Sequence, residues 1–457
     1  MNQLHPKTRG QTPAGAATRV AYVMNAFPRL SETFIAQEIH QLERTGLGLS
    51  LFVVKREDEP QRHPIVDRIR APRHDLPPVS SLSGTQLLPW LRRNAPAYAA
   101  AHGRQLRRHP LRYLATLGSA LGLTLRHWPR KVFVKEFLQA GHIADAVATD
   151  AGIGHLHGHF CHGVATITWM ASRMSGVPFS FTAHAKDIYQ AELNPGRLLE
   201  RKLGAARFVA TCTCANAQVL QQRHPQPARV HTIYHGLDTA HFAPATAAQA
   251  ASRPGSPLVL AVGRLVEKKG FDTLVEAIAL LRAQGRPLRC RIVGEDGSAG
   301  DALRAQIARL RLDGSVELHG PVTQDQLREV YHEAQIFALP CRILDDGDRD
   351  GFPNVLAEAM ASGVPVVSTA ISGIPEMVDD GVHGLLVPPQ DAAALAAAIA
   401  RLLDDPELHA RIAAAGRQRI CERFDARVTT LALRGLFEQQ LALRRGLRSW
   451  HEGRAAA

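Results

Sequence analysis

Two cations occupy a short turn, GRLVEKKG at residues 263–270, that directly follows an apolar segment. Gly263 permits a sharp turn at the end of a strand. Arg264 and Lys269 would then lie beside backbone amides, an arrangement that suits a diphosphate whose negative charge grows as it departs. The glycine spacing excludes both a P-loop and a GxGxxG fingerprint. By itself, the turn is interpreted equally well as a solvated basic loop.

Two acids stand eight positions apart in the segment DGFPNVLAE at residues 350–358. Pro353 suits the first turn of a helix, which places Asp350 before the helix and Glu358 about two turns further on. The free N–H groups at such a helix start favour a phosphate, and the carboxylate of Glu358 can accept hydrogen bonds from a ribose diol. Taken alone, such a pair of acids is more often two unrelated surface groups.

Alternating strand and helix patterns lead up to these motifs in the N-terminal half. Residues 31–43 and 86–144 have helical character, and four leucines share one helical face (Leu114, Leu117, Leu121 and Leu125). The polar, Pro-rich residues 57–78 predict a loop. Strands are predicted at residues 19–25, 47–54, 152–160, 177–183, 207–212 and 229–234.

A second β-α series follows residues 244–257, whose small, polar, Pro-containing composition is typical of a linker. Strands are predicted at residues 258–262, 288–293, 316–319, 336–339, 364–368 and 384–387, with an Ala-rich helix at residues 392–403. This alternation predicts an α/β protein with two doubly wound, Rossmann-like domains, and ligands in such folds bind beyond the carboxyl ends of the strands. We expect a flexible tail at 1–18, domains at 19–243 and 258–424, and a helix at 425–457.

Composition excludes several classes of protein. Of 457 residues, 45% are hydrophobic and 21% charged, which excludes a wholly disordered or fibrous chain. No apolar run reaches the ~20 residues that cross a bilayer, and no apolar core follows the first basic residues, so we expect neither a membrane span nor a secretory signal, and a cytoplasmic protein. The six cysteines are scattered without CxxC spacing, which argues against a disulfide framework or a zinc ribbon.

The basic excess is concentrated in one stretch. The net charge is +12, and residues 84–136 contain ten basic residues against the single acid Glu136. Such a patch predicts a localised anionic partner. No nucleic-acid motif accompanies the charge, so we expect no nucleic-acid partner. Two interpretations stay open: a helical insertion with solvated arginines, or contact with an anionic membrane, which Trp90, Tyr113 and Trp128 would assist.

Together, the basic turn and the acidic helix resemble the C-terminal domain of the family 4 retaining glycosyltransferases, which have the GT-B fold. The resemblance extends over residues 258–424 and includes ALP at 338–340, GIPE at 373–376 and GVHGLLVPP at 381–389. It implies two domains that face each other across a cleft. It also implies a nucleotide-diphosphate sugar as donor, with no cofactor required.

The resemblance assigns roles to individual residues of the donor site. Arg264 and Lys269 would hold the diphosphate, Glu358 the ribose hydroxyls, and Asp350 the donor sugar. Asp350 departs from the family's usual Glu and is one methylene shorter. The other donor-site residues implied are Gly263, Gly351, Phe352, Pro353 and Asn354.

The N-terminal half resembles the colanic acid and exopolysaccharide branch of that family. The motifs are FPRLSETFI at 27–35, HGHF at 157–160 and FSFTAHAKDIY at 179–189. The resemblance implies that His184 approaches the sugar with Asp187 nearby, and that Ser31 and Glu32 face the cleft. Without the resemblance, His184 would be interpreted as a satisfied core histidine, and Ser31 as a helix N-cap.

Two groups of potential metal ligands have less specific interpretations. His155, His157 and His159 would share one face of a strand, with His162 close by, and could bind zinc. The acids at 345–350 could coordinate Mg²⁺. The resemblance implies strand histidines without metal and a diphosphate neutralised by Arg and Lys. We therefore expect no essential metal, and a solvated loop at Asp345 to Asp348.

The resemblance implies a retaining hexosyltransferase. It would transfer a hexose from a nucleotide-diphosphate sugar to a saccharide, expected to be lipid-linked, in exopolysaccharide or lipopolysaccharide biosynthesis. Two alternatives stay open: another GT-B enzyme such as a nucleotide-sugar epimerase, or a basic module that binds membranes or nucleic acid without catalysis. The sequence identifies neither the sugar nor the acceptor.

Overall fold

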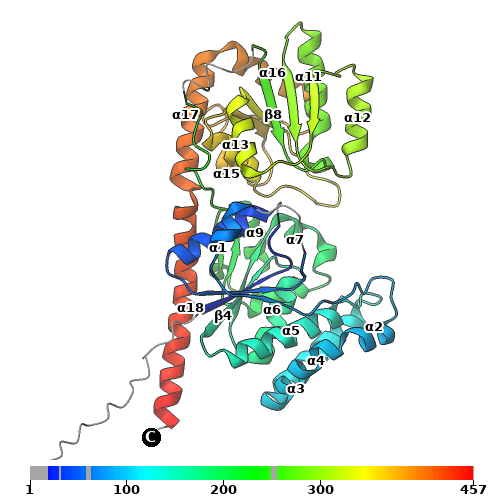
Figure 1. Cartoon of the computed structure of the whole chain (residues 1–457), viewed down its shortest axis with the longest axis vertical. Helices are drawn as coiled ribbons and strands as arrows, with labels where there is room; N and C mark the ends of the chain where they lie inside the picture. The colour runs from blue at the N-terminus through cyan, green and yellow to red at the C-terminus, as the bar shows by residue number, and fades with distance from the viewer. Residues whose placement is uncertain (1–18, 30–31, 58–62, 247–248, 250–254, 456–457) are drawn as a thin grey trace, which may run out of the picture.

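The computed structural model describes residues 19–29, 32–57, 63–246, 249 and 255–455. The expected tail, Ser31 and half of the expected linker lie outside these residues. The chain forms two lobes, each built on one parallel sheet, and α18 (Ala426–Ala455) runs alongside the N-terminal lobe (Figure 1). Within the described part of the chain, no helix has the length and apolar character that a bilayer span requires.

The N-terminal lobe contains a seven-stranded sheet in the order β3-β2-β1-β4-β5-β6-β7. Its strands are β1 (Arg19–Met24), β2 (Leu49–Val53), β3 (Arg73–Asp75), β4 (Ile153–His159), β5 (Phe179–Ala183), β6 (Val209–Thr211) and β7 (Val230–Thr232). Its helices are α1 (Thr33–Arg44), α2 (Leu87–Asn94), α3 (Pro96–Arg108), α4 (Pro110–Arg126), α5 (Val132–Thr149), α6 (Val164–Ser175), α7 (Ala185–Tyr189), α8 (Leu198–Ala205) and α9 (Cys214–Arg223).

The C-terminal lobe contains a six-stranded sheet in the order β10-β9-β8-β11-β12-β13. Its strands are β8 (Leu258–Val262), β9 (Arg289–Val293), β10 (Val316–His319), β11 (Ile336–Leu339), β12 (Val366–Thr369) and β13 (Leu385–Val387). Its helices are α11 (Phe271–Ala283), α12 (Gly300–Arg309), α13 (Gln324–Glu333), α14 (Asn354–Ala361), α15 (Ile374–Met377), α16 (Ala392–Asp404) and α17 (Pro406–Arg423).

Nearly continuous apolar runs explain the strands β1 and β8, whereas the buried β4 also contains three histidines. All five residues of β8 are buried, as expected for a parallel strand that helices cover on both faces. In the N-terminal lobe, Leu433 and Phe437 of α18 pack against the core that includes Val20 and Tyr22 of β1. The chain therefore crosses back at its end and covers the sheet with which it began.

Every predicted strand is confirmed to within a few residues, but the predicted loop at 57–78 is wrong in part. The short strand β3 pairs with β2, and a 3-10 helix spans Pro64–Arg68. All three β3 residues are exposed and polar. An edge strand of this kind has no apolar periodicity, so no sequence pattern identified it.

Candidate active site

The basic turn places Lys269 against the carboxyl end of β8. The backbone of Gly263 has φ +153°, and a Cβ at this position would lie 2.9 Å from the Lys269 Cε. Gly270 has φ +69°, and a Cβ there would collide with the carbonyl oxygen of Pro340. Both glycines therefore let the lysine side chain fold back across the end of the sheet.

Lys269 forms an ion pair with the first acid of the acidic motif. Its Nζ lies 2.6 Å from the Asp350 Oδ2, and Lys268 lies 3.8 Å from the other carboxylate oxygen. Burial lowers the pKa of Lys269, but Asp350 outweighs burial and the pKa is raised overall. Burial likewise raises the pKa of Asp350, and the two lysines lower it by more. Both groups are therefore charged in a poorly solvated place, where an anionic ligand could compete for the lysine.

Arg264 is exposed beside this ion pair. Its charge acts on the pKa of Lys269, so the two cations share one electrostatic environment. Arg264 therefore lies at the open side of the turn while Lys269 lies at its base. This arrangement provides two cations at the carboxyl ends of the C-terminal strands.

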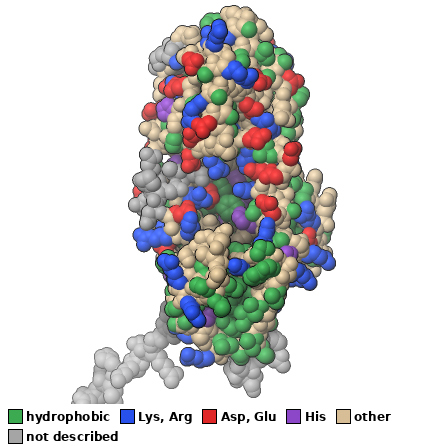
Figure 2. All heavy atoms as spheres, turned by 90° about the vertical axis from the view of Figure 1, so that its right-hand side faces the viewer, with side chains coloured by type: hydrophobic (Ala, Val, Ile, Leu, Met, Phe, Trp, Pro, Cys, Tyr) green, Lys and Arg blue, Asp and Glu red, His purple; other side chains and the backbone are tan. Residues whose placement is uncertain are grey.

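Glu358 lies inside α14, with 5% of its surface exposed. Burial raises its pKa to about 7, although a hydrogen bond from the Tyr331 hydroxyl, at 3.0 Å, opposes the rise. Its neighbours in a shared hollow come from both lobes, so Glu358 faces the space between them. The lining residues are Thr33, Phe34, Gln37, His235, Gly236, Leu237, Gln324, Phe352, Asn354, Ala357 and Glu358. Figure 2 shows charged side chains and histidine gathered around the middle of the molecule.

The residues between the two acids connect the lobes. A Cβ on Gly351 would lie 2.8 Å from the Cβ of Ala185, so the acidic motif meets the start of α7 closely. Phe352 is buried against Tyr234 and Phe424, which gives it a packing role. Pro353 is the N-cap of α14 rather than a residue of its first turn. The Asn354 Oδ1 accepts a hydrogen bond at 3.2 Å from the His235 Nδ1.

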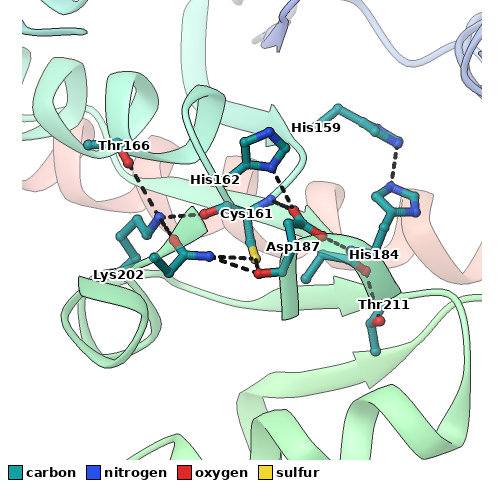
Figure 3. A network of polar contacts seen from close by, with 10 residues as sticks. His159, Cys161, His162, Thr166, His184, Asp187, Lys202 and Thr211 are labelled. Carbon is teal, nitrogen blue, oxygen red and sulfur yellow. Dashed lines mark hydrogen bonds and ion pairs between the residues drawn. The ribbon is translucent and has the colours of Figure 1, made fainter. Parts of the chain in front are cut away.

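His184 immediately precedes α7, where β5 ends. Its Nε2 lies 2.9 Å from the His159 Nε2 (Figure 3), and its ring centroid lies 5.5 Å from that of Phe34. Burial lowers the pKa of His184 well below its ordinary value, so the ring is neutral. With Nε2 bonded to His159, the neutral ring has Nδ1 left for a ligand, and a group without charge suits a sugar hydroxyl better than an anion.

Asp187 positions α7. Its carboxylate accepts hydrogen bonds from the backbone N–H of His184, at 2.8 Å, and from that of Cys161 (Figure 3). The buried Lys202 holds the same loop through the Asn194 side chain, which donates to the Asp187 carbonyl. Asp187 thus acts on His184 through the backbone in this structure. Glu32, predicted to face substrate, is the N-cap residue of α1 and lies 3.4 Å from Arg29.

Each histidine of β4 is hydrogen-bonded to a hydroxyl group, and the three do not form a group of metal ligands among the described residues. His155 and His157 each lie 2.8 Å from the Ser180 Oγ, and His157 also bonds Thr182. A different trio in the described residues could hold a metal: one atom each of His184, Cys212 and His235 lies within 4.8 Å of the other two. Burial raises the pKa of the Cys212 thiol to about 12, so a metal would have to displace a firmly held proton.

The acidic loop is less solvated than the sequence suggests. Asp348 pairs with Lys268 at 2.9 Å, and Asp346 accepts a hydrogen bond from Gln190 of the N-terminal lobe at 2.8 Å. The prediction of a solvated loop is therefore wrong at Asp348, which is only partly exposed, whereas Asp346 is exposed as predicted but is hydrogen-bonded to the other lobe. Their partners are distant in sequence, which the local pattern does not reveal.

Two cleft residues were missed by sequence reasoning. His235 stacks on Phe34 with ring centroids 4.2 Å apart, and Glu376 accepts hydrogen bonds from the N–H groups of Cys214 and Ala215 at the start of α9. Glu376 stands inside the quoted GIPE segment, and His235 follows β7. A polar residue beyond the end of a strand was the available signal in the case of His235.

The basic stretch at 84–136 has two kinds of arginine. Arg104 and Arg108 both bind the Asp145 carboxylate of α5, at 2.6 and 3.1 Å, so these two arginines secure the scaffold. Arg92, Arg93, Arg107 and Arg126 are exposed. The predicted leucine face of α4 points largely outward, since Leu114, Leu121 and Leu125 are 54%, 48% and 75% exposed.

Comparison with known proteins connects this geometry to a family. Residues 244–419 match the model of the glycosyl transferases group 1. The chain is 31% identical over 314 residues to the D-inositol 3-phosphate glycosyltransferase of Saccharomonospora viridis. This match covers 64% of this chain and 71% of that protein. It is also 36% identical over 215 residues to WcaL of Salmonella typhimurium, assigned to colanic acid biosynthesis. That match covers 46% of this chain and about half of WcaL, 52%.

Solved structures agree on the fold. HepE from Anabaena in complex with UDP has a TM-score of 0.65 at 16% identity, over 92% of this chain and 100% of that one. The fold is therefore GT-B, as the resemblance implied. The resemblance to the colanic acid branch is also confirmed.

Proposed function

The chain belongs to the group 1 glycosyltransferases, and we propose from this premise that it transfers a hexose from a nucleotide-diphosphate sugar to a saccharide acceptor. The acceptor would be a growing unit of exopolysaccharide or lipopolysaccharide. The curated relative WcaL is assigned to colanic acid biosynthesis, and HepE was solved with UDP. Both support this choice of pathway class and donor class.

One observation carries the proposal: the Lys269–Asp350 ion pair and the His184 segment meet across the cleft. Asp350 lies 2.6 Å from Lys269, and Gly351, the next residue, packs against Ala185, the residue after His184. A bound donor would therefore have cations at its diphosphate and a neutral imidazole at its sugar. The two ends of a sugar nucleotide differ in charge in the same way.

The leaving diphosphate gains negative charge as the glycosidic bond breaks. Lys269 and Arg264 would stabilise that charge, and the free N–H groups at the start of α14 would add to the effect. Glu358 would accept hydrogen bonds from the ribose diol. Each role uses groups that are already oriented, which lowers the reorganisation cost of the step.

The reaction would retain the anomeric configuration by a front-face route. The acceptor hydroxyl attacks on the side from which the diphosphate leaves, and a diphosphate oxygen takes its proton. No protein base is then required. Closure of the two lobes would exclude water and limit hydrolysis of the donor.

Incubation of the full chain with a panel of nucleotide-diphosphate sugars tests this function. A transferase raises its melting temperature with one nucleotide and slowly releases nucleotide diphosphate in the absence of acceptor. Release with inversion of the sugar, or interconversion of two nucleotide sugars without release, would contradict the proposal. The second result would instead support an epimerase.

An exposed apolar surface favours a membrane-bound acceptor. Eight large hydrophobic side chains of residues 88–132 are exposed: Leu88, Leu106, Leu111, Leu114, Leu121, Leu125, Trp128 and Val132. Figure 2 shows a large hydrophobic area on the lower part of the face it presents, on the side where α2–α4 lie in Figure 1. The exposed arginines of the same helices complement an anionic bilayer. We propose that this surface contacts the inner face of the cell membrane.

Flotation with vesicles tests the membrane surface. Wild type should float with vesicles that contain anionic lipid and much less with neutral ones. Leu111→Ser combined with Leu125→Ser should abolish flotation, because these residues are 82% and 75% exposed. Leu431→Ser, at a 56% exposed position of α18, is the matched control and should float like wild type. Equal flotation of both variants would contradict the proposed surface.

A further inference from the structure

A buried chain of hydrogen bonds leads from α1 to His184. The Tyr22 hydroxyl of β1 contacts the Glu38 Oε1 and lies 3.0 Å from the His159 Nδ1. The His159 Nε2 in turn lies 2.9 Å from the His184 Nε2, as Figure 3 shows. Tyr22 and His159 have no exposed surface, and the Glu38 side chain is 17% exposed.

Proton counting gives this chain a direction. Burial lowers the pKa of His159 and of His184 well below the ordinary value, so each ring is neutral and has one N–H and one lone pair. A tyrosine hydroxyl has one proton to donate. Once the donor and the acceptor of one hydrogen bond in this chain are fixed, those of every other hydrogen bond in it are fixed as well.

With Glu38 ionised, the direction is set from its end. Tyr22 donates to the carboxylate and therefore accepts from the His159 Nδ1–H. The His159 Nε2 is then a lone pair, which accepts from the His184 Nε2–H. The remaining nitrogen of His184, Nδ1, has a lone pair and can only accept.

When Glu38 is protonated, it donates a hydrogen bond to the Tyr22 oxygen, and every hydrogen bond in the chain then reverses its direction. Tyr22 then donates to the His159 Nδ1, His159 donates through Nε2 to His184, and the His184 Nδ1 bears the hydrogen. The hydrogen-bond chain takes up one proton from solvent in this change: Glu38 gains a hydrogen, Tyr22 keeps its own, and each imidazole still has one hydrogen, now on its other nitrogen. We propose that Glu38, Tyr22 and His159 are positioning residues that fix the tautomer of His184, and that the protonation state of Glu38 decides whether Nδ1 accepts or donates.

The surroundings of Glu38 allow it to titrate. Burial raises its pKa to about 7, while the Tyr22 hydrogen bond opposes the rise. Besides Tyr22, the titratable neighbours are His159, with Nδ1 at 3.8 Å from Glu38, and Tyr234 and His235, which line the same small hollow. The α18 residues of that hollow carry no charge: Ala426, Thr429, Thr430 and Leu433.

The consequence for transfer rests on the proposed function. An accepting Nδ1 favours a donor sugar that presents a hydroxyl and disfavours one that presents a carboxylate, which has only lone pairs. This hydrogen-bond chain would therefore make the enzyme select a neutral hexose over a uronic acid above about pH 7. This selectivity would weaken in more acid solution.

Long-range ¹H–¹⁵N spectra of the full chain with ¹⁵N-labelled histidine test the tautomer directly, since they distinguish the two neutral forms. His184→Gln assigns the signal. In wild type, the His184 signal should change from the Nε2–H form to the Nδ1–H form as the pH falls through about 7. In Tyr22→Phe and in Glu38→Gln this change should be lost. Tyr98→Phe, which removes another buried hydroxyl, bonded to the Pro77 carbonyl, is the control and should keep it.

A tautomer of His184 that is the same from pH 8 to pH 6 in wild type would overturn the proposal. So would a pH-dependent change that survives Tyr22→Phe. Neither result depends on transferase activity, so a failure of the proposed function is seen separately, as absence of nucleotide release.

Turnover provides a second measurement. In wild type, the ratio of kcat/KM for the neutral donor to kcat/KM for the corresponding uronic acid donor should fall about five- to tenfold between pH 8 and pH 6, the worth of one hydrogen bond. Glu358 also titrates near this pH, with a pKa of about 7. The informative quantity is therefore the difference between wild type and Tyr22→Phe, which both retain Glu358. Identical pH profiles of these two proteins would contradict the proposed role of the chain.

Discussion

The two strand edges that face the cleft differ in charge. The edge of the C-terminal lobe holds Lys269 and Asp350 as ions, kept charged by each other. The edge of the N-terminal lobe holds His159 and His184 as neutral rings, because burial lowers the pKa of each. A ligand that bridges both edges must itself be charged at one end and neutral at the other, as a sugar nucleotide is.

The largest predicted change in activity follows from removing the buried lysine of the C-terminal lobe, Lys269. Lys269→Ala should lower turnover by roughly 10²–10³-fold, the range observed when one group that stabilises a leaving oxyanion is lost. Lys268→Ala is the matched control, because Lys268 binds Asp348 and lies one residue away. It should lose less than about tenfold. Both proteins are first checked for an unchanged circular dichroism spectrum, and equal losses in the two would contradict the role of Lys269.

Lowering the pH should reduce the stability of the folded protein through the buried histidine His155 of β4. Burial lowers the pKa of His155 to about 3 in the folded state, whereas the unfolded chain takes up the proton near pH 6.5. The unfolded state therefore binds more protons as the pH falls below about 6.5, and His155 costs about 1.4 kcal/mol of stability for each pH unit.

Urea unfolding at pH 7.5 and pH 5.5 measures this dependence. His155→Gln should flatten the fall in unfolding free energy between the two pH values by about 1 kcal/mol. His319→Gln, at an exposed position of β10, serves as the control and should keep the wild-type slope. An unchanged slope in His155→Gln would show that His155 is not held neutral.

Loss of the Glu358 carboxylate should chiefly weaken nucleotide binding. Glu358→Gln should raise the Kd for the nucleotide diphosphate about tenfold, because a carboxylate accepts both ribose hydroxyls more strongly than an amide. Wild-type affinity should also rise as the pH rises through about 7, where this group ionises. Tyr331→Phe retains the carboxylate and should change Kd less. Calorimetry checks all three, and an unchanged Kd in Glu358→Gln would contradict the assignment.

Chelation should have the smallest effect. If arginine and lysine alone neutralise the diphosphate, EDTA should change turnover less than twofold. A loss that zinc restores would instead point to the trio of His184, Cys212 and His235. Cys212→Ser and His235→Gln would then abolish the rescue by zinc.

Local patterns predicted most of the fold. Strands such as β8 and β11 are buried on both faces and consist of short apolar runs between turn residues, so their positions follow from the sequence. The exposed strand β3 lacks that signal and was missed. The basic turn and the acidic helix were recognisable by residue types and spacing, and the structure places Lys269 beside Asp350.

The sequence by itself determined where the strands and helices form and which residues could bind a diphosphate, because these depend on neighbours in the chain. Tertiary structure alone decided which distant residue a polar side chain contacts. Arg104 contacts Asp145, and His184 contacts His159. It also decided that a leucine face of α4 stays exposed. Helical periodicity creates an apolar stripe, but only the packing of distant segments determines whether that stripe is covered.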